Sequence, residues 1–294
     1  MANLLFETLG RTGLNAWRKC RKNTLAWVCV LMAITASGHP EYSIQVEEIT
    51  TRIEQEPVNA HLYLHRADLH RQAHRFDLAL ADVATAARLK RDWPLVSLVR
   101  GEIQFDAGHP EDALKSVEQF LRSETNHAPA LLLRAHCHRQ LGLPELAVAD
   151  YDAALKIFAQ PNPDWFIERA RLEAALGRFD KAIEGLEEGM NRLGMVPGLQ
   201  LAALELERQT GRFDAALRRI NKMAKGGSNT PAEWLLKAEV LEQAGRLTSA
   251  RDAFQNVVAP SAGPGVHRDT ELAQALRQKA REGLERVQQR LSRS

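Results

Sequence analysis

The chain has 294 residues, of which 45% are hydrophobic and 26% charged. These values are typical of a folded protein and exclude a disordered, collagen-like or multi-span membrane chain. The 39 basic and 37 acidic side chains give a formal net charge of +2, so charge gives no reason to expect a nucleic-acid partner. Three cysteines are too few for a disulfide framework.

Residues 1–38 have the order of a secretory signal. Five basic residues precede an uncharged apolar run from Leu25 to Ala36, which is shorter than the roughly 20 residues of a bilayer-spanning helix. Small side chains follow this run, and we expect cleavage after Gly38. An uncleaved membrane anchor and a mitochondrial presequence are the alternatives. The sequence thus predicts an exported protein of the bacterial periplasm, or one anchored in the inner membrane and facing the periplasm.

Loss of this segment would change both charge and thiol content. It carries five basic residues and one acid, so 34 basic and 36 acidic residues would remain, a net charge of −2. Cys137 would be the one thiol left, without an intrachain disulfide partner. Because it lies in an apolar helical pattern, we interpret it as a small core residue.

A period of about 34 residues runs through the rest of the chain. Six short turn-like strings open at intervals of 34, 34, 35, 34 and 34 residues, at His74, Gly108, Gly142, Gly177, Gly211 and Gly245. Five residues later each has an alanine: Ala79, Ala113, Ala147, Ala182, Ala216 and Ala250. Seven residues earlier the column is small except at Leu204: Ala67, Gly101, Ala135, Ala170, Leu204 and Ala238. Internal repeats of this length indicate an array of similar units.

The columns predict a pair of helices in each unit. Glycine readily takes the left-handed conformation that ends a helix, and two antiparallel helices pack closely where a side chain at the crossing is small. Larger apolar residues recur one helical turn after the alanines, where we expect the core between units. These residues are Val83, Val117, Tyr151, Leu186, Ile220 and Phe254.

This combination of period, turn glycine and small-residue columns resembles the tetratricopeptide repeat family. His74 departs from the pattern, since it replaces the turn glycine of the first unit. The resemblance implies an all-α, right-handed superhelical solenoid of about six helix-turn-helix repeats. It covers residues 60–264, divided as 60–93, 94–127, 128–162, 163–196, 197–230 and 231–264.

Helices are also expected at both ends of the array. Residues 39–59 form an N-terminal capping half-repeat with Val46, Ile49 and Ile53 on one face. A linker rich in proline and glycine occupies residues 259–269. Residues 265–294 form a C-terminal capping helix, whose apolar stripe is Leu272, Leu276, Leu284, Val287 and Leu291. We interpret its basic face as solvated surface.

The resemblance further implies a concave groove, lined by the first helix of each repeat, that binds a peptide or a helix of a partner protein. The arginines of the groove could pair with acidic residues of a ligand or with neighbouring acids of this chain such as Glu168. The sequence favours pairing within the chain. We expect the first three repeats to form the docking half. The candidate groove residues are His61, Leu64, His65, Asp68, Arg71, Glu102, Asp106, Leu132, His136, Arg139, Glu168, Arg171, Glu205 and Arg208.

One known use of the family is not expected. Co-chaperone members clamp a carboxyl terminus with lysines and asparagines, and those side chains are missing at the matching positions of this chain. A chaperone's C-terminal tail is therefore not predicted as the ligand. The residues at these positions are Leu64, Asp68, Val99, Pro129 and Leu133.

The sequence contains little that indicates a metal site or a catalytic site. His61 and His65 are four residues apart, a spacing that can bring two imidazoles to one metal, but no further ligand completes a site. No phosphate-binding loop, nucleophile elbow or zinc-hydrolase helix is recognisable. We therefore predict an exported non-enzymatic scaffold that binds a protein or peptide, without cofactor, metal or nucleic acid. The alternative is a periplasmic metal-handling or pH-sensing protein using His61 and His65.

Overall fold

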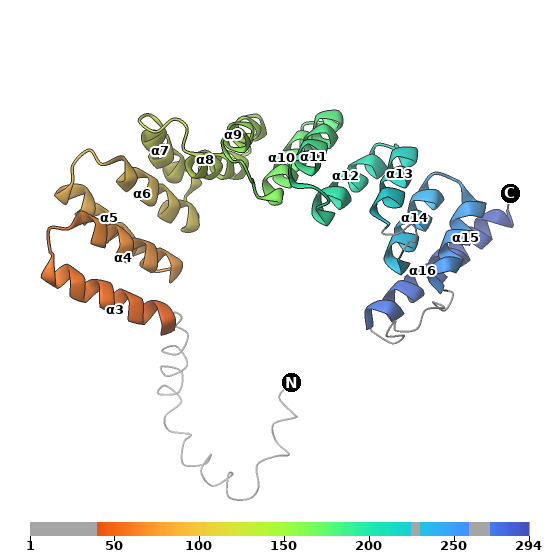
Figure 1. Ribbon diagram of the computed structural model, residues 1–294, viewed down its shortest axis with the longest axis horizontal. Coiled ribbons are helices and arrows are strands. Elements are labelled where there is room, and N and C mark those ends of the chain that lie inside the picture. Colours follow the sequence, from red (N-terminus) through yellow and green to blue (C-terminus); the bar gives the residue numbers. More distant parts are fainter. Residues whose placement is uncertain (1–39, 225–229, 259–270, 294) are drawn as a thin grey trace, which may run out of the picture. The chain divides into compact units, whose positions relative to one another are not determined.

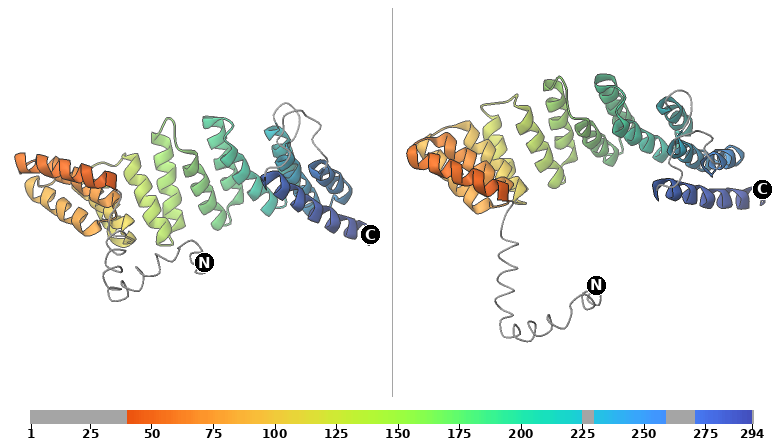
Figure 2. Two further views of the ribbon diagram at one scale, coloured as in Figure 1. Left: turned by 90° about the horizontal axis from the view of Figure 1, so that it is seen from below. Right: turned by 60° about the horizontal axis from the view of Figure 1, so that its bottom comes forward.

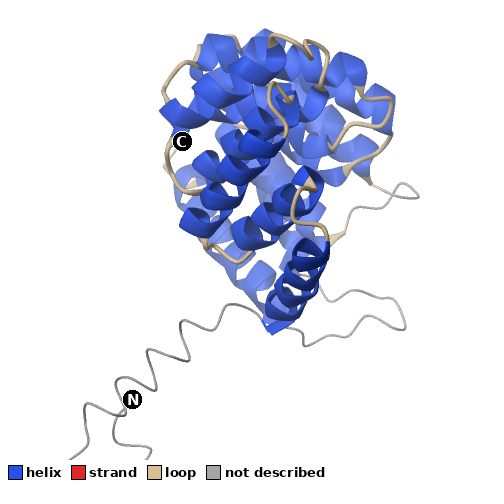
Figure 3. Cartoon of the chain, turned by 90° about the vertical axis from the view of Figure 1, so that its left-hand side faces the viewer, coloured by secondary structure: helices blue, strands red, loops and turns tan. Residues whose placement is uncertain are grey.

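A computed structural model describes residues 40–224, 230–258 and 271–293. All regular structure in these ranges is helical (Figure 3). The expected signal segment, residues 1–38, and the expected linker, residues 259–269, lie outside the described residues. Within the described helices, none is both long and apolar enough to cross a membrane.

The chain divides into two compact units, one up to Ser123 and one from Glu124. In the first unit, α4 pairs with α5 and α6 with α7, while α3 packs on α4 (Figure 1). The first helices of the two pairs, α4 and α6, are also in contact. The helices are α3 (Pro40–Gln55), α4 (Ala60–Gln72), α5 (Phe76–Leu89), α6 (Pro94–Asp106) and α7 (Pro110–Leu121).

The second unit contains four more pairs, each packed against the next (Figure 2). α16 follows the last pair and packs on both of its helices. The paired helices and the additional helix at each end confirm the expected all-α repeat solenoid. The helices are α8 (Ala128–Gln140), α9 (Pro144–Ile157), α10 (Pro163–Ala175), α11 (Phe179–Leu193), α12 (Pro197–Gln209), α13 (Phe213–Met223), α14 (Pro231–Gln243), α15 (Leu247–Val258) and α16 (Glu271–Leu291).

The turn inside each pair explains the glycine column. The five turn glycines have φ between 70° and 81°, a conformation that costs energy for residues with a Cβ. The next residue then donates its N–H to a carbonyl five residues back, as Leu143 does to His138, which ends the first helix in a Schellman motif. His74 adopts φ 56° and makes the same turn without glycine.

The small-residue columns lie where the helices of each pair cross. All six alanines of the second helices are fully buried, and so are the larger residues one turn later, from Val83 to Phe254. Leu204 is also buried and takes the place of the small residue in the fifth pair. The predicted positions of the core residues are thereby confirmed.

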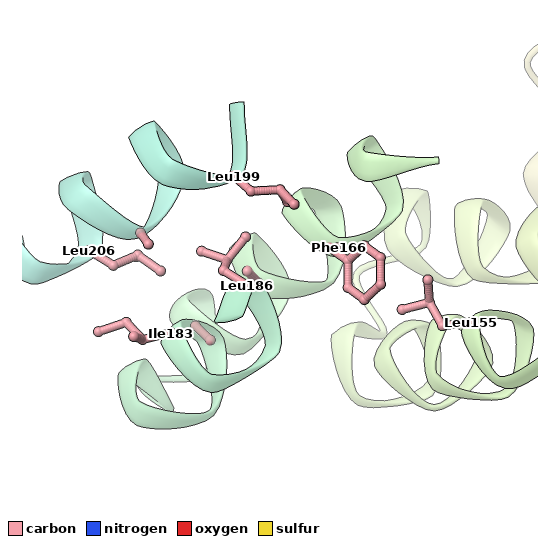
Figure 4. Packing of buried hydrophobic residues seen from close by; sticks show 9 residues of the cluster. Leu155, Phe166, Ile183, Leu186, Leu199 and Leu206 are labelled. Atoms are coloured by element: carbon pink, nitrogen blue, oxygen red, sulfur yellow. The ribbon is translucent and has the colours of Figure 1, made fainter. Parts of the chain in front are cut away.

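Apolar side chains from several helices form the core of the second unit. Phe166 of α10 packs near Leu155 of α9, and Leu186 of α11 packs with Leu199 and Leu206 of α12 (Figure 4). Gly189 allows the close approach of Phe166, because a Cβ there would lie 2.9 Å from the Phe166 Cγ. This packing holds α10, α11 and α12 together, which positions the site described below.

The end helices bury the predicted stripes with one exception. Ile49 and Ile53 of α3 are buried, and Val287 of α16 is buried beside the partly buried Leu276 and Leu284. Leu272 was expected in this stripe, but 70% of it is exposed. It lies at the first turn of α16, one turn before the residues that pack on α15.

Candidate functional site

Polar side chains on the first helices form bridges from one repeat to the next. In the first unit, Arg71 of α4 is the central residue. Its Nη1 lies 2.5 Å from Oδ2 of Asp106 on α6, and its Nη2 lies 2.6 Å from Oδ1 of Asp68. Burial raises the pKa of the adjacent Glu102 carboxyl; Arg71 lowers it, and Asp68 and Asp106 raise it further. Four candidate groove residues therefore meet in one cluster.

Arg208 forms the corresponding bridge from α12 to α14. Its Nε donates to Oε1 of Gln243 at 3.0 Å, and its Nη1 lies 3.9 Å from a Glu239 carboxylate oxygen. The same Nη1 is 3.5 Å from Glu205 on its own helix. At the end of the array, Lys279 of α16 pairs with Glu239 at 2.8 Å. The bridging pattern thus continues onto the capping helix.

A weaker pair joins α8 to α10. The Arg139 Nε lies 3.9 Å from Glu168, and Arg171 pairs with the same carboxylate at 2.7 Å. All four arginines proposed for the groove therefore pair with carboxylates of this chain, as the sequence favoured.

The bridging position is the third residue before each turn residue. In repeat order it is occupied by Arg71, Phe105, Arg139, Ala174, Arg208 and Glu242. Ala174 is the one small side chain in this column. Within the described residues, no ion pair and no side-chain hydrogen bond joins α10 to α12, so the interface of these two helices lacks a bridge.

A cavity of about 320 Å³ lies at this unbridged interface. Its floor is aliphatic, and two candidate groove residues, Arg171 and Glu205, stand at its edge. Their side chains are 71% and 55% exposed. The lining residues are Ile167, Ala170, Arg171 and Ala174 of α10, Leu186 of α11, and Ala202, Glu205, Leu206 and Gln209 of α12.

Two of the expected groove residues do not line a surface. Leu64 and Leu132 are only 5% and 7% exposed, and Leu64 packs in the core of the first unit. The prediction that they line the groove was wrong, since these two side chains have almost no area to offer a ligand. His136 is partly buried, with its ring 6.0 Å from that of Tyr151. Burial and, less strongly, Arg139 lower the His136 pKa, while Glu168 raises it.

The histidine pair proposed for metal binding is exposed on α4. The His61 ring packs against the Trp93 ring, with 4.4 Å between the centroids. His65 is exposed one turn further along the helix. Within the described residues, no group of three or more histidine, cysteine, aspartate or glutamate side chains is placed to hold a metal ion. The structure therefore adds no ligand to this pair.

Cys137 is buried, as its position in an apolar helix predicted. Burial raises the pKa of its thiol to about 11. The reactive thiolate is therefore scarce near neutral pH.

Sequence analysis did not identify a second set of charges, inside the repeats. In the third pair, Asp150 of α9 accepts from Arg134 at 2.6 Å and contacts His138 at 3.0 Å. In the fifth pair, the columns of His138 and Asp150 hold Glu207 and Arg219, which pair at 2.7 Å. The sequence contains a signal for this pairing. The two columns lie four residues before and eight residues after the turn residue, and their residue types change together from repeat to repeat. These contacts tie the two helices of one repeat and leave little side chain for a ligand.

The helix pairs and their columns define this chain as a helical repeat solenoid. The model of the tetratricopeptide repeat family matches residues 98–162 and 201–265. These two stretches of the chain are therefore tetratricopeptide repeats. No curated protein sequence matches it.

Several solved structures share the fold at low sequence identity. The C-terminal part of a TPR repeat-containing protein from Cytophaga hutchinsonii gives a TM-score of 0.61 at 14% identity, covering 80% of this chain and 94% of that one. YrrB, described as a TPR protein with an unusual peptide-binding site, gives 0.51 at 16% identity, covering 71% and 99%. PilF of Pseudomonas aeruginosa gives 0.50 at 13% identity, covering 76% and 96%.

Proposed function

We propose that this protein is a non-enzymatic scaffold that binds a segment of a partner protein on the face formed by α10 and α12. The tetratricopeptide fold supports a role in protein–protein interaction. The cavity of about 320 Å³ between these helices is the observation that carries the proposal. Within this family, YrrB is described as having a peptide-binding site.

The cavity has the composition of a peptide site. Ala170, Ala174 and Ala202 leave space above a floor that includes Leu206, while Arg171 and Glu205 offer charges at the rim. Apolar pockets with a few convergent polar groups are the usual form of binding sites. Because these side chains stand on packed helices, little ordering entropy is lost from the protein when a ligand docks.

The sequence predicted that the first three repeats form the docking half. Contacts within the first two repeats argue against this placement. Asp68, Arg71 and Asp106 already satisfy one another through short contacts. A ligand would have to break these contacts before forming its own. Among the described residues, no ion pair or side-chain hydrogen bond crosses from α10 to α12, so a ligand between these helices would break no bridge between repeats.

Site-specific cross-linking tests the proposed surface. A photo-cross-linking residue replaces Arg171 beside the cavity or, as a control, the exposed Lys181 on α11. The cross-linked partner segment is identified by mass spectrometry, synthesised, and titrated into the full chain. We expect a segment captured from position 171 to bind in a 1:1 complex, and Ala202→Trp to abolish that binding. Equal capture from both positions, or binding that survives Ala202→Trp, would move the site elsewhere.

We also propose that residues 1–38 direct export, with cleavage after Gly38. The support is the order of basic, apolar and small residues in this segment. Mass spectrometry of protein from a periplasmic extract should show His39 as the first residue. Retention in the membrane with an intact N-terminus would indicate an anchor, and recovery from the cytoplasm would contradict export.

A further inference from the structure

We infer that the cavity between α10 and α12 recognises an arginine side chain of the bound segment. The inference rests on the proposed function and names the chemistry of its ligand. The bound arginine would occupy the place that the chain's own arginines occupy at neighbouring interfaces.

The next interface along the chain shows the arrangement complete. Arg208 lies between α12 and α14, where it contacts Gln243 at 3.0 Å and Glu239 at 3.9 Å. Exactly one 34-residue period earlier, Gln209 and Glu205 stand on α12 at the corresponding positions. The acceptor half of the bridge is therefore repeated with identical residue types.

At the interface of α10 and α12, the arginine that would donate to Glu205 and Gln209 is missing. The position that corresponds to Arg208 is Ala174, whose side chain ends at Cβ. Ala174, Glu205 and Gln209 all line the cavity. The space between α10 and α12 is thus bounded by the residues that would surround an arginine.

Glu205 retains capacity for a second cation. Its counterpart Glu239 pairs with two cations, Arg208 through Oε2 and Lys279 through Oε1. Glu205 pairs with Arg208 through Oε2, while among the described residues its Oε1 accepts only from the neutral Gln209 amide, at 3.1 Å. A ligand guanidinium could approach this oxygen, with its methylene stem on the aliphatic floor.

Arg171 is a cationic side chain at the cavity and would repel a cationic ligand. Its guanidinium pairs with Glu168 at 2.7 Å, which offsets the repulsion. Its high exposure also screens the remainder in water. An acidic ligand residue could instead pair with Arg171, so a glutamate peptide is included in the test.

The test uses capped pentapeptides with the sequence Ala-Ala-X-Ala-Ala, where X is arginine, citrulline, leucine or glutamate. Each is titrated into the full chain, and backbone amide shifts of α10 and α12 are followed by NMR. We expect saturable shifts at Ala174, Ala202 and Gln209 with the arginine peptide. The citrulline peptide has nearly the same shape without the charge, and its affinity should be at least about tenfold lower, as for the loss of one charge-assisted contact.

Two variants and one control connect the binding to the inferred place. Ala174→Arg supplies the missing side chain and should abolish saturation by the arginine peptide. Glu205→Gln removes the carboxylate on an exposed side chain and should reduce the affinity at least about tenfold. Glu184→Gln, an exposed charge change on α11, should leave the affinity unchanged. Circular dichroism spectra establish that each variant keeps its helices.

The results separate this inference from the proposed function. Leucine, glutamate or citrulline peptides binding as tightly as the arginine peptide would overturn the inference, as would the absence of saturation with arginine. If the cross-linked partner segment binds at α10 and α12 and keeps its affinity when its arginines are replaced by alanine, the scaffold role stands and the arginine rule fails. If no segment binds on this face, both fail.

Discussion

Arg71 of α4 and Asp106 of α6 lie 2.5 Å apart and join the first helices of two successive repeats. Their side chains are partly exposed, so solvent screens much of the attraction. Arg71 also pairs with Asp68 on its own helix, which holds the guanidinium in position.

A double-mutant cycle measures what this bridge contributes. We expect Arg71→Ala and Asp106→Ala to show a coupling of about 0.5–1 kcal/mol in the free energy of unfolding, measured by urea denaturation. The coupling should fall at 1 M NaCl, where screening is stronger. A coupling indistinguishable from zero at low salt would show that the pair does not tie the repeats.

The crossing of α8 and α9 provides a test of the packing. Ala147 is fully buried there, so Ala147→Trp forces a large ring into a filled space. We expect a loss of about 1–3 kcal/mol or more in stability, seen as a lower melting temperature. Ala149→Trp, two residues away on the exposed face of α9, is the control and should change stability little. Equal melting temperatures for the two variants would contradict the assigned crossing.

The turn of the first pair contains a correctable local strain. His74 has φ 56° where the other turns have glycine, and a Cβ in this region costs about 1–2 kcal/mol. His74→Gly should therefore stabilise the protein, with the gain reduced to about 1 kcal/mol by the greater entropy of glycine in the unfolded chain. Thermal denaturation measures this change. Destabilisation on introducing glycine would mean that the His74 side chain contributes more than its backbone costs.

The raised pKa of Glu102 predicts how the stability of the protein depends on pH. Burial raises the pKa of its carboxyl above the unfolded value, so the folded state favours the protonated form. This contribution is complete below the unfolded pKa of about 4.3 and is lost as pH rises through the folded pKa. Glu102→Gln should therefore raise the melting temperature at pH 7 and change it little at pH 4. A lower melting temperature at pH 7 would show that pairing with Arg71 outweighs burial.

The fold followed from the sequence because its determinants recur every 34 residues. A glycine with positive φ and a small residue at a helix crossing are local requirements, so their columns identify the helix pairs. Leu272 shows where pattern alone fails. It has the right spacing for the apolar stripe of α16, but whether that turn meets α15 depends on where the helix begins.

The candidate site was harder to predict, for two physical reasons. The cavity depends on a side chain that is absent, since Ala174 is unremarkable until compared with the arginines of its column. Whether a residue such as Leu132 faces a ligand or the core depends on the rotation of its helix, which the 34-residue spacing of the columns does not fix. The acidic residue lies on the second helix in the pair His138–Asp150 and on the first helix in the pair Glu207–Arg219. In the sequence this swap shows only as a correlation between two columns.

The most direct measurement is a crystal structure of the full chain saturated with the arginine pentapeptide. We expect the peptide on α10 and α12, with its guanidinium within about 3 Å of the Glu205 carboxylate and the Gln209 side-chain oxygen, a hydrogen-bonding distance. A peptide bound elsewhere, or an arginine pointing away from Glu205 into solvent, would contradict it.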